Sequence, residues 1–422
     1  MVHTTVNEVC GEILHTLAEK LNTRIESFSF EKPVQLKTTD IAPQYYDKHV
    51  KASRDVEMTA LNHSALQYLG SNGYFNLRYN DALGAYDMVT VSADQTKLVY
   101  VAANMVPHFV ITDSVRSAIL CYSDNHHKEI REFVGGLAAN DFKGFRYSLP
   151  KSYLEKIQKN HAVTQEDYYT YWNNVMRGAD AVLSLSEPVL VKNLSKTLYG
   201  DSKALERYYL SGIARIIDPE MCSTEASVKE ILERHNVFSV PPAVSVRGDA
   251  IIRYSDGQSV DLTAFRYSIK LSPEQVQTIT SCSCKAIVTI ENETVFESMP
   301  LEPGTIFIYS GGFANNVVIE LLNTVMACTG ITEIEHFGDL DPSGFGISKD
   351  IARRLAHGTL RRRWMDRDSL PRYIGLMQMG SLQRKRFTAM LQDPYYTDRD
   401  RDIMQVLLDW NVVAEQEGFC FA

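Results

Sequence analysis

The stretch Glu-Ile-Glu-His-Phe-Gly-Asp-Leu-Asp-Pro-Ser-Gly-Phe-Gly-Ile at residues 333–347 decides the fold of the last third of the chain. Residues 333–337 predict a β-strand, and residues 348–356 predict a helix. Two aspartates, a proline and two glycines stand between them, so we expect the backbone to turn tightly before the helix begins. A strand, a polar turn and a helix in this order are typical of an α/β domain.

Further strands and helices alternate upstream of this stretch. Residues 285–290 and 305–309 predict strands, and residues 273–281 and 315–326 predict helices. Such alternation implies a mostly parallel sheet, in which ligand sites lie at the carboxyl ends of the strands. We therefore expect a C-terminal α/β domain at residues 272–422.

Three acidic residues follow two of these strands. Glu291 comes directly after residues 285–290, and Asp339 and Asp341 come directly after residues 333–337. Residues two apart in an extended segment project to the same side, so both aspartates can face one point. The alternative is an exposed Asp-Leu-Asp turn. The pattern predicts Glu291, Asp339 and Asp341 as catalytic residues and as an all-oxygen site for Mg²⁺ or Mn²⁺.

The expected cluster needs a cation, because close carboxylates repel one another and raise each other's pKa. A bound divalent ion reverses this effect and can activate water against a phosphodiester. The N-terminus of the helix that follows the aspartates adds a favourable potential for an anion. Asn292, Asp366 and Glu417 are possible supporting residues near this site, with a structural role as the alternative.

The N-terminal part of the chain predicts a helix followed by a hairpin, and we assign residues 1–120 to this domain. Residues 55–70 carry apolar residues at helical spacing and end at Ser71-Asn72-Gly73. Residues 86–92 and 97–103 then predict two strands. This order suggests a winged helix, and the alternative is a helix packed on a hairpin without a ligand.

The middle part, residues 121–271, is expected to be a helical or winged-helix DNA-binding region. Residues 187–219 predict a short helix, a turn at Tyr199-Gly200-Asp201 and a helix over 202–217 capped by Asp201 or Ser202. This is helix-turn-helix spacing. The candidate phosphate contacts are Lys192, Lys196, Lys203 and Arg207. The alternative is a solvated helix surface.

Basic residues also gather after the acidic motif. Arg353 and Arg354 are followed by three arginines at 361–363 and by Arg384-Lys385-Arg386. Such residues can track a DNA backbone beside the acids, and the alternative is again an ordinary solvated surface.

Composition limits the class of protein. The chain has 422 residues, 45% hydrophobic and 23% charged, which predicts two or three globular domains rather than disorder. A net charge of −9 argues against a uniformly basic DNA-packaging protein, but local basic patches remain possible. No apolar run reaches membrane length, and charges interrupt residues 1–21, so we expect a cytoplasmic protein without a membrane span.

The cysteines predict free thiols. The seven are scattered, and only Cys282 and Cys284 are close in sequence. One residue between them is too few for a zinc knuckle, and no partner pair follows.

Three segments of the C-terminal part resemble a known family. Residues 286–293 (Ala-Ile-Val-Thr-Ile-Glu-Asn-Glu), 310–313 (Ser-Gly-Gly-Phe) and 337–347 resemble the Toprim domain of JetD, the nuclease subunit of Wadjet plasmid-defence systems. They resemble the A subunit of topoisomerase VI more distantly. Residues 364–367 and 415–417 are also in the family order, and Tyr199-Gly200-Asp201-Ser202-Lys203 resembles a segment found upstream in the family.

The resemblance implies a multidomain α+β enzyme with winged-helix and Toprim domains, which forms a homodimer. Its implied substrate is double-stranded, circular plasmid DNA. Its implied partner is a condensin-like SMC motor complex of the JetABC kind, which controls cleavage.

Three classes of function are compatible with the sequence. The first is a metal-dependent endonuclease that hydrolyses DNA. The second is a topoisomerase-like transesterase that uses a tyrosine, although none of the 22 tyrosines is singled out by its context; Tyr74 lies near the expected wing. The third is a non-catalytic DNA-binding adaptor, which would not need to retain all three acids. Hydrolysis is the favoured interpretation.

Overall fold

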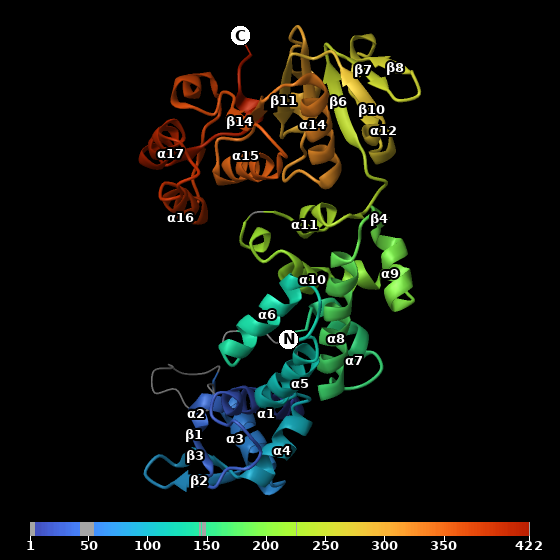
Figure 1. Ribbon diagram of the computed structural model, residues 1–422. Helices are drawn as coiled ribbons and strands as arrows, with labels where there is room; N and C mark the ends of the chain where they lie inside the picture. Colours follow the sequence, from blue (N-terminus) through green and yellow to red (C-terminus); the bar gives the residue numbers. More distant parts are fainter. Residues whose placement is uncertain (1–4, 43–54, 143–144, 146–148, 225, 422) are drawn as a thin grey trace. The chain divides into compact units, whose positions relative to one another are not determined.

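The computed structural model describes residues 5–42, 55–142, 145, 149–224 and 226–421 (Figure 1). The chain divides into two compact units. Unit 1 contains the residues up to Arg177 and Arg207–Tyr209, and unit 2 contains Gly178–Glu206 and the residues from Leu210 onward. Among the described residues, no helix has the length and apolar character that a membrane span requires.

Unit 1 combines a small sheet with several helices. Its elements are α1 (Val6–Asn22), β1 (Val34–Lys37), α2 (Thr38–Ile41), α3 (Asp55–Ser71), β2 (Asn76–Asn80), β3 (Ala85–Val91), α4 (Ala93–Ala102), α5 (His108–Leu120), α6 (Lys128–Ala139), α7 (Lys151–Gln158) and α8 (Gln165–Leu183), which continues into unit 2. The strands form an antiparallel sheet in the order β1-β3-β2. Helices α1, α3 and α4 pack together over a core that includes Leu17, Leu66 and Val89.

The predicted hairpin is wrong in its second strand. Residues 97–103 belong largely to helix α4, and the partner of β3 is β2, which precedes it. Ser92 starts α4 with a capping box, in which its side chain accepts from Gln95 N and the Gln95 side chain accepts from Ser92 N. The buried residues Thr96, Val99 and Tyr100 then face α1 at helical spacing. Local capping and packing therefore override the β-branched composition of this stretch.

Unit 2 begins with short elements. These are β4 (Val189–Leu190), α9 (Val191–Tyr199), the π-helical turn η1 (Leu205–Tyr209), whose last three residues belong to unit 1, α10 (Leu210–Ile217), η2 (Met221–Ser223), α11 (Val228–Arg234) and β5 (Val237–Phe238). The turn after α9 is as predicted, because Gly200 ends the helix in the left-handed conformation. The next helix starts later than residue 202: the Asp201 side chain accepts from Lys203 N in the turn before it.

The rest of unit 2 carries the main sheet. Its elements are β6 (Val244–Gly248), β7 (Ile251–Tyr254), β8 (Ser259–Asp261), η3 (Leu262–Ala264), β9 (Ile269–Leu271), α12 (Pro273–Gln277), β10 (Ile279–Cys282), β11 (Ala286–Ile290), α13 (Glu293–Ser298), β12 (Thr305–Tyr309), α14 (Asn316–Thr329), β13 (Glu333–Phe337), α15 (Pro342–Arg354), β14 (Thr359–Arg362), η4 (Arg367–Arg372), β15 (Met377–Gln378), α16 (Ser381–Met390), α17 (Asp398–Trp410), β16 (Val412–Val413) and η5 (Gln416–Gly418). The helix expected over 273–281 is thus short and gives way to β10.

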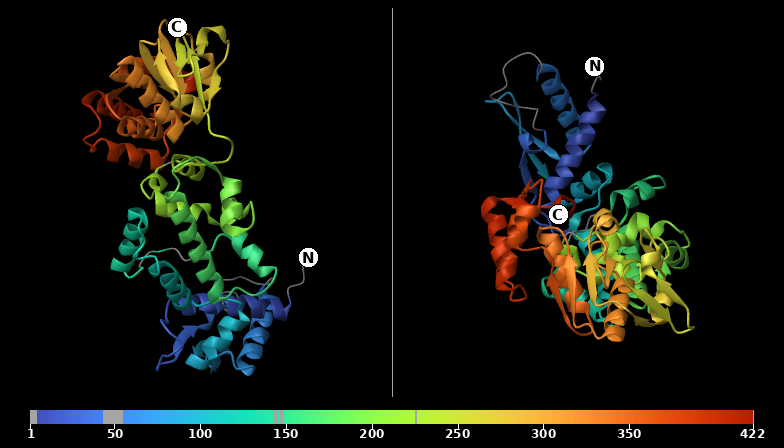
Figure 2. Two further views of the ribbon diagram at one scale, coloured as in Figure 1. Left: turned by 45° about the vertical axis from the view of Figure 1, so that its right-hand side comes forward. Right: turned by 90° about the horizontal axis from the view of Figure 1, so that it is seen from above.

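The main sheet is mixed and has the order β14-β13-β11-β12-β6-β9. The first four strands are parallel, whereas β6 and β9 are antiparallel to their neighbours. This confirms a multidomain α+β architecture with a C-terminal sheet. In both views of Figure 2 the red C-terminal helices lie to one side of the orange strands. They share with the sheet a core that includes Val288, Phe337 and Leu407.

Helix α15 begins earlier than predicted. Asp341 is its N-cap, with the side chain accepting from Gly344 N at 2.8 Å, and Pro342 occupies the first turn. Proline is favoured there because its missing N–H has no intrahelical partner to lose. Gly344 and Gly346 therefore lie inside the helix, not in a turn before it.

Candidate functional site

The carboxyl ends of three parallel strands meet at one edge of the main sheet. Ile290 of β11 pairs with Tyr309 of β12 and with Phe337 of β13. The next residue, Glu291, donates its N–H to Phe337 O at 3.1 Å. Because the three strands end in register, the residues that follow them lie close together, at the edge where parallel sheets bind ligands.

Glu291 and Asp339 are in direct contact at this edge. The backbone N–H of Asp339 donates to Oε2 of Glu291 at 3.3 Å. Burial, followed by the negative charges of Asp339 and Asp341, raises the pKa of Glu291 to about 8. Glu291 is therefore an acid that retains its proton near neutral pH when no cation balances its charge.

Asp339 is held by the C-terminal segment. Its Oδ1 accepts a hydrogen bond of 2.7 Å from Gln416 N, which favours the ionised form. Burial outweighs this bond, and together with the charges of Asp341, Glu417 and Glu415 it raises the pKa of Asp339 to about 7. The cluster is thus electrostatically strained without a positive charge.

Gln416 is a site residue that the sequence did not reveal. Its side chain is buried, donates to Phe337 O at 2.9 Å and accepts from Asn292 N at 2.8 Å. It thereby ties the C-terminal segment to the ends of β11 and β13. The available sequence signal was an uncharged amide between two glutamates. The structure shows both glutamates exposed and the amide buried, and buried amides usually have defined hydrogen-bond partners.

Asp341 lies beside Glu291 and Asp339, and it also caps a helix. One of its carboxylate oxygens caps α15 through Gly344 N, so the first turn of that helix is partly occupied by the chain itself. Its charge still raises the pKa values of Glu291 and Asp339. Among the described residues, the three carboxylates do not form a group whose ligand atoms all lie within 4.8 Å of one another. The structure therefore gives a close Glu291–Asp339 pair with Asp341 next to it.

A polar cavity of about 310 Å³ opens at the pair. Its lining residues are Glu291, Asn292, Glu293, Thr294, Tyr309, Gly311, Gly312 and Asp339. Polar groups thus dominate the walls. Among these residues, Tyr309 and Glu293 were not predicted as site residues.

The glycine wall of the cavity is fixed by Glu230 of α11, another residue that the sequence did not reveal. Oε1 of Glu230 accepts from Phe313 N at 3.0 Å, and its Oε2 accepts from Ser227 N at 2.7 Å. A Cβ on Gly312 would lie 2.3 Å from that Oε1, and Gly312 has a φ of 81°. Glycine is required here by both the backbone conformation and the close approach.

The donor set fits a divalent cation. All the candidate ligand atoms are carboxylate oxygens, which Mg²⁺ and Mn²⁺ prefer. Burial and repulsion between carboxylates raise the pKa values of Glu291 and Asp339. A bound cation offsets both the burial of the charges and their repulsion. Glu291 and Asp339 are placed to hold the cation, and Asp341 lies beside them.

The close approach of Asp339 to α15 requires glycine at position 344, and this can be tested. A Cβ on Gly344 would lie 2.3 Å from Asp339 O, whereas one on Gly346 would meet Phe313 Cζ at an ordinary 3.8 Å. We expect Gly344→Ala to lower the free energy of unfolding by about 1 to 3 kcal/mol through overpacking. Gly346→Ala is the matched control and should be neutral or stabilising by up to about 1 kcal/mol. Thermal unfolding of both variants checks this, and equal stabilities would contradict it.

The predicted supporting residues have distinct places. Asn292 donates its side-chain amide to Glu417 Oε1 at 2.5 Å and caps α13 through Val295 N. Glu417 is exposed and adds negative charge near Asp339. Asp366 is buried, caps η4 through Ser369 N and pairs with Arg399 at 2.6 Å. Asn292 and Glu417 thus border the site, whereas the contacts of Asp366 are structural.

The predicted basic residues of the middle region are exposed. Lys192 and Lys196 lie on α9, where Lys196 donates to Gly200 O at 2.8 Å, and Lys203 lies in the turn that follows. Arg207 is also exposed but belongs to unit 1. Exposure leaves these side chains accessible to phosphates without identifying a ligand.

The two adjacent arginines of α15 differ sharply. Arg353 is largely exposed and pairs with exposed Glu220 at 3.4 Å. Arg354 is 15% exposed and donates to Ala314 O, Asn316 Oδ1 and Asp350. The arginines at 361–363 likewise pair with acidic residues. Much of the predicted basic surface is therefore engaged within unit 2.

We expect Arg354→Ala to destabilise unit 2 by about 3 to 5 kcal/mol, because it removes one partner of a buried ionic network. Arg353→Ala should cost at most about 1 kcal/mol, as exposed pairs do. Thermal unfolding of the two variants measures the difference. A surface role for Arg354 would give similar, small losses in both.

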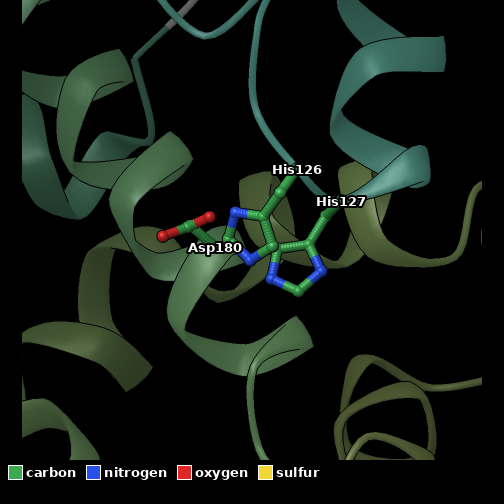
Figure 3. Close-up of side chains that lie close together, drawn as sticks. All are labelled: His126, His127 and Asp180. Carbon is green, nitrogen blue, oxygen red and sulfur yellow. The ribbon is translucent and has the colours of Figure 1, made fainter.

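Figure 3 shows one further group of side chains, His126, His127 and Asp180. The two histidines precede α6 in unit 1, whereas Asp180 belongs to unit 2. Because these residues belong to different units, we assign no site to them.

Unit 2 thus contains an α/β domain with a carboxylate pair at the carboxyl edge of its parallel strands. The family model described as Wadjet protein JetD, C-terminal, matches residues 244–420, which include all of this sheet. The Wadjet protein JetD of Bacillus cereus (strain Q1) is 25% identical over 219 residues, which cover 50% of this chain and 53% of that protein. The matched region therefore spans about half the length of that curated relative. The resemblance to JetD is confirmed, and the C-terminal part of the chain is similar to the C-terminal part of JetD proteins.

Proposed function

We propose that this chain is a divalent-metal-dependent endonuclease that hydrolyses DNA, as the cleaving component of a Wadjet-type defence system. The observation that carries the proposal is the Glu291–Asp339 pair at the in-register ends of β11 and β13, with both pKa values raised. Perturbed carboxyl groups that converge in a polar cavity are candidates for chemistry.

The proposed roles follow from the contacts of each residue. A bound Mg²⁺ or Mn²⁺ supplies charge neutralisation and Lewis-acid activation of water against a phosphodiester. Glu291 and Asp339 hold the cation, and Gln416 N orients Asp339. Asp341 orients the start of α15 while adding negative charge to the cluster. The Toprim assignment of this domain is part of the proposal.

The order of helices and strands in unit 1 supports a DNA-binding role for it. Its first elements run α1, β1, α2, α3, β2, β3, and the strands form one antiparallel sheet. A helical core followed by a two-stranded wing is typical of winged-helix domains, which bind DNA. Double-stranded DNA is therefore the proposed substrate, and Lys192, Lys196 and Lys203 of unit 2 are further proposed phosphate contacts.

Hydrolysis is favoured over transfer to a tyrosine. Tyr309 lines the cavity, and burial followed by the charges of Glu293 and Glu291 raises its pKa. A raised pKa disfavours the phenolate that would attack phosphorus. Tyr309 is therefore a poor nucleophile, and water is the nucleophile that we propose.

The proposed partners come from the relationship to JetD. A condensin-like SMC motor complex would deliver circular plasmid DNA, and two copies of the chain would cut both strands.

A plasmid-cleavage assay tests the function. Purified chain is incubated with supercoiled plasmid and Mg²⁺ or Mn²⁺, alone and with the motor complex and ATP, and the DNA ends are analysed. The proposal expects cation-dependent cutting that leaves free ends. Protein-linked ends would indicate a transesterase, and intact plasmid in every condition would indicate an adaptor.

A further inference from the structure

His336 is a fully buried histidine in the middle of β13. Its Nε2 atom has no hydrogen-bond partner among the described residues, whereas its Nδ1 atom lies 2.9 Å from Oγ1 of Thr289. Burial, and then the charge of Arg362, lowers the pKa of His336 to about 3, so the imidazole is neutral. A buried polar atom without a partner destabilises the folded state, so the position of Nε2 needs a reason.

The free Nε2 atom borders the same small space as the carboxyl group of Glu291. Thr289 pairs with His336 across the sheet, and Glu291 follows Thr289 by two residues, which places it on the same face. A Cβ on Gly338 would lie 2.7 Å from Oε2 of Glu291 and 2.8 Å from Nε2 of His336. The space between the two groups is open because residue 338 is glycine.

The hydroxyl of Thr289 bears on which ring nitrogen of His336 carries the proton. The Thr289 hydroxyl has one proton, which it can donate either to Glu335 O at 3.2 Å or to His336 Nδ1 at the shorter distance of 2.9 Å. When the hydroxyl donates to Nδ1, the neutral imidazole carries its proton on Nε2. An N–H group then faces the space that Glu291 also borders, with no change in the charge of the histidine.

We propose that His336 is a positioning residue for Glu291, whose carboxylate accepts a hydrogen bond from Nε2–H through one water molecule in the space beside Gly338. This bond holds the carboxylate toward the cavity in the form that binds a cation. The part of the inference that concerns a cation rests on the proposed function. The contact between the two side chains does not.

The contact is tested first, without any metal. Long-range ¹H–¹⁵N spectra of the full chain with ¹⁵N-labelled histidine report the protonation and hydrogen bonding of each ring nitrogen. The signals of His336 are assigned as those lost in His336→Gln among the 11 histidines. We expect Glu291→Ala to shift the Nε2 signal of His336, and an unchanged signal overturns the proposal.

The effect on cation binding is tested second, by titration calorimetry with Mn²⁺. We expect His336→Leu to weaken Mn²⁺ binding by about 10- to 100-fold, as loss of a residue that orients a metal ligand does. His336→Gln places an amide N–H at a similar reach and should restore most of the affinity. Thermal unfolding confirms that each variant is folded.

The NMR and calorimetry measurements distinguish the His336–Glu291 interaction from the proposed metal site. If wild-type protein does not bind Mn²⁺ but the Nε2 signal responds to Glu291→Ala, the metal site fails and the contact stands. If wild-type protein and folded His336→Leu bind Mn²⁺ equally, the positioning role is rejected while the metal site survives. Equal weakening in His336→Gln and His336→Leu would reduce the role of His336 to packing.

Discussion

Replacement of Glu291 by Gln, or of Asp339 by Asn, is expected to reduce plasmid cleavage by roughly 10³-fold or more. Each change removes a carboxylate that would hold the cation while keeping the size of the side chain. Cation catalysis contributes several kcal/mol to a phosphodiester reaction, and about 1.4 kcal/mol corresponds to a factor of ten in rate. Initial rates of plasmid nicking at saturating Mn²⁺, with the motor complex where wild type requires it, measure the effect.

The matched control is Glu333→Gln. Glu333 begins the same strand, β13, but lies at its amino end, where it is exposed and pairs with Arg361 at 3.5 Å. Its loss should change the rate by no more than a few fold, because exposed ion pairs contribute at most about 1 kcal/mol. A nicking rate that survives in Glu291→Gln and Asp339→Asn would refute the assignment of the site. A loss in Glu333→Gln alone would place the chemistry at the other end of the sheet.

Mn²⁺ affinity is expected to rise steeply with pH, by roughly 10²-fold between pH 6 and pH 8. In the cation-free protein the pKa is about 8 for Glu291 and about 7 for Asp339, so protons occupy both groups below pH 7. The cation binds the ionised forms and must displace these protons, so each occupied group reduces the affinity by up to about tenfold per pH unit. Calorimetry in buffers with different heats of ionisation measures both the affinity and the number of protons released.

The same groups set the pH dependence of stability without a cation. Their pKa values in the folded chain are raised above the ordinary values of about 4, so between about pH 4 and pH 8 the folded state binds more protons than the unfolded state. The free energy of unfolding must therefore fall as pH rises through this window. Glu291→Gln should weaken that dependence and should release fewer protons when Mn²⁺ is added. A pH-independent affinity, with no proton release, would show that neither group is protonated in the free site.

Much of the C-terminal framework was predictable from sequence. The strands at residues 286–290 and 305–309 are short apolar runs, residues 333–337 form a short run of mixed polar and apolar residues, and all three strands are present. Glu291 and Asp339 were singled out because they directly follow two of these runs. The errors occurred where local and tertiary signals differ. Residues 97–101 have β-branched composition, yet the Ser92 cap and packing on α1 make them helical.

The details of the site were not predictable in the same way. Gln416 reaches Asp339 from 77 residues away, and Glu230 reaches Phe313 from 83 residues away. Nothing near either residue in the sequence marks its partner. The free Nε2 of His336 likewise becomes visible only when β13 is placed beside β11.

The sequence by itself determined the three parallel strands at residues 286–290, 305–309 and 333–337, the turn at Gly200 and the position of each acid relative to its own strand. These features depend on periodicity and on hydrogen bonds between residues a few positions apart. Tertiary structure alone decided that β11 and β13 are neighbours in register, that Arg354 is buried while Arg353 is exposed, and that Asp341 caps a helix beside the carboxylate pair. The physical reason is that burial and the repulsion between carboxylates depend on distances in space, which packing sets between segments far apart in the chain.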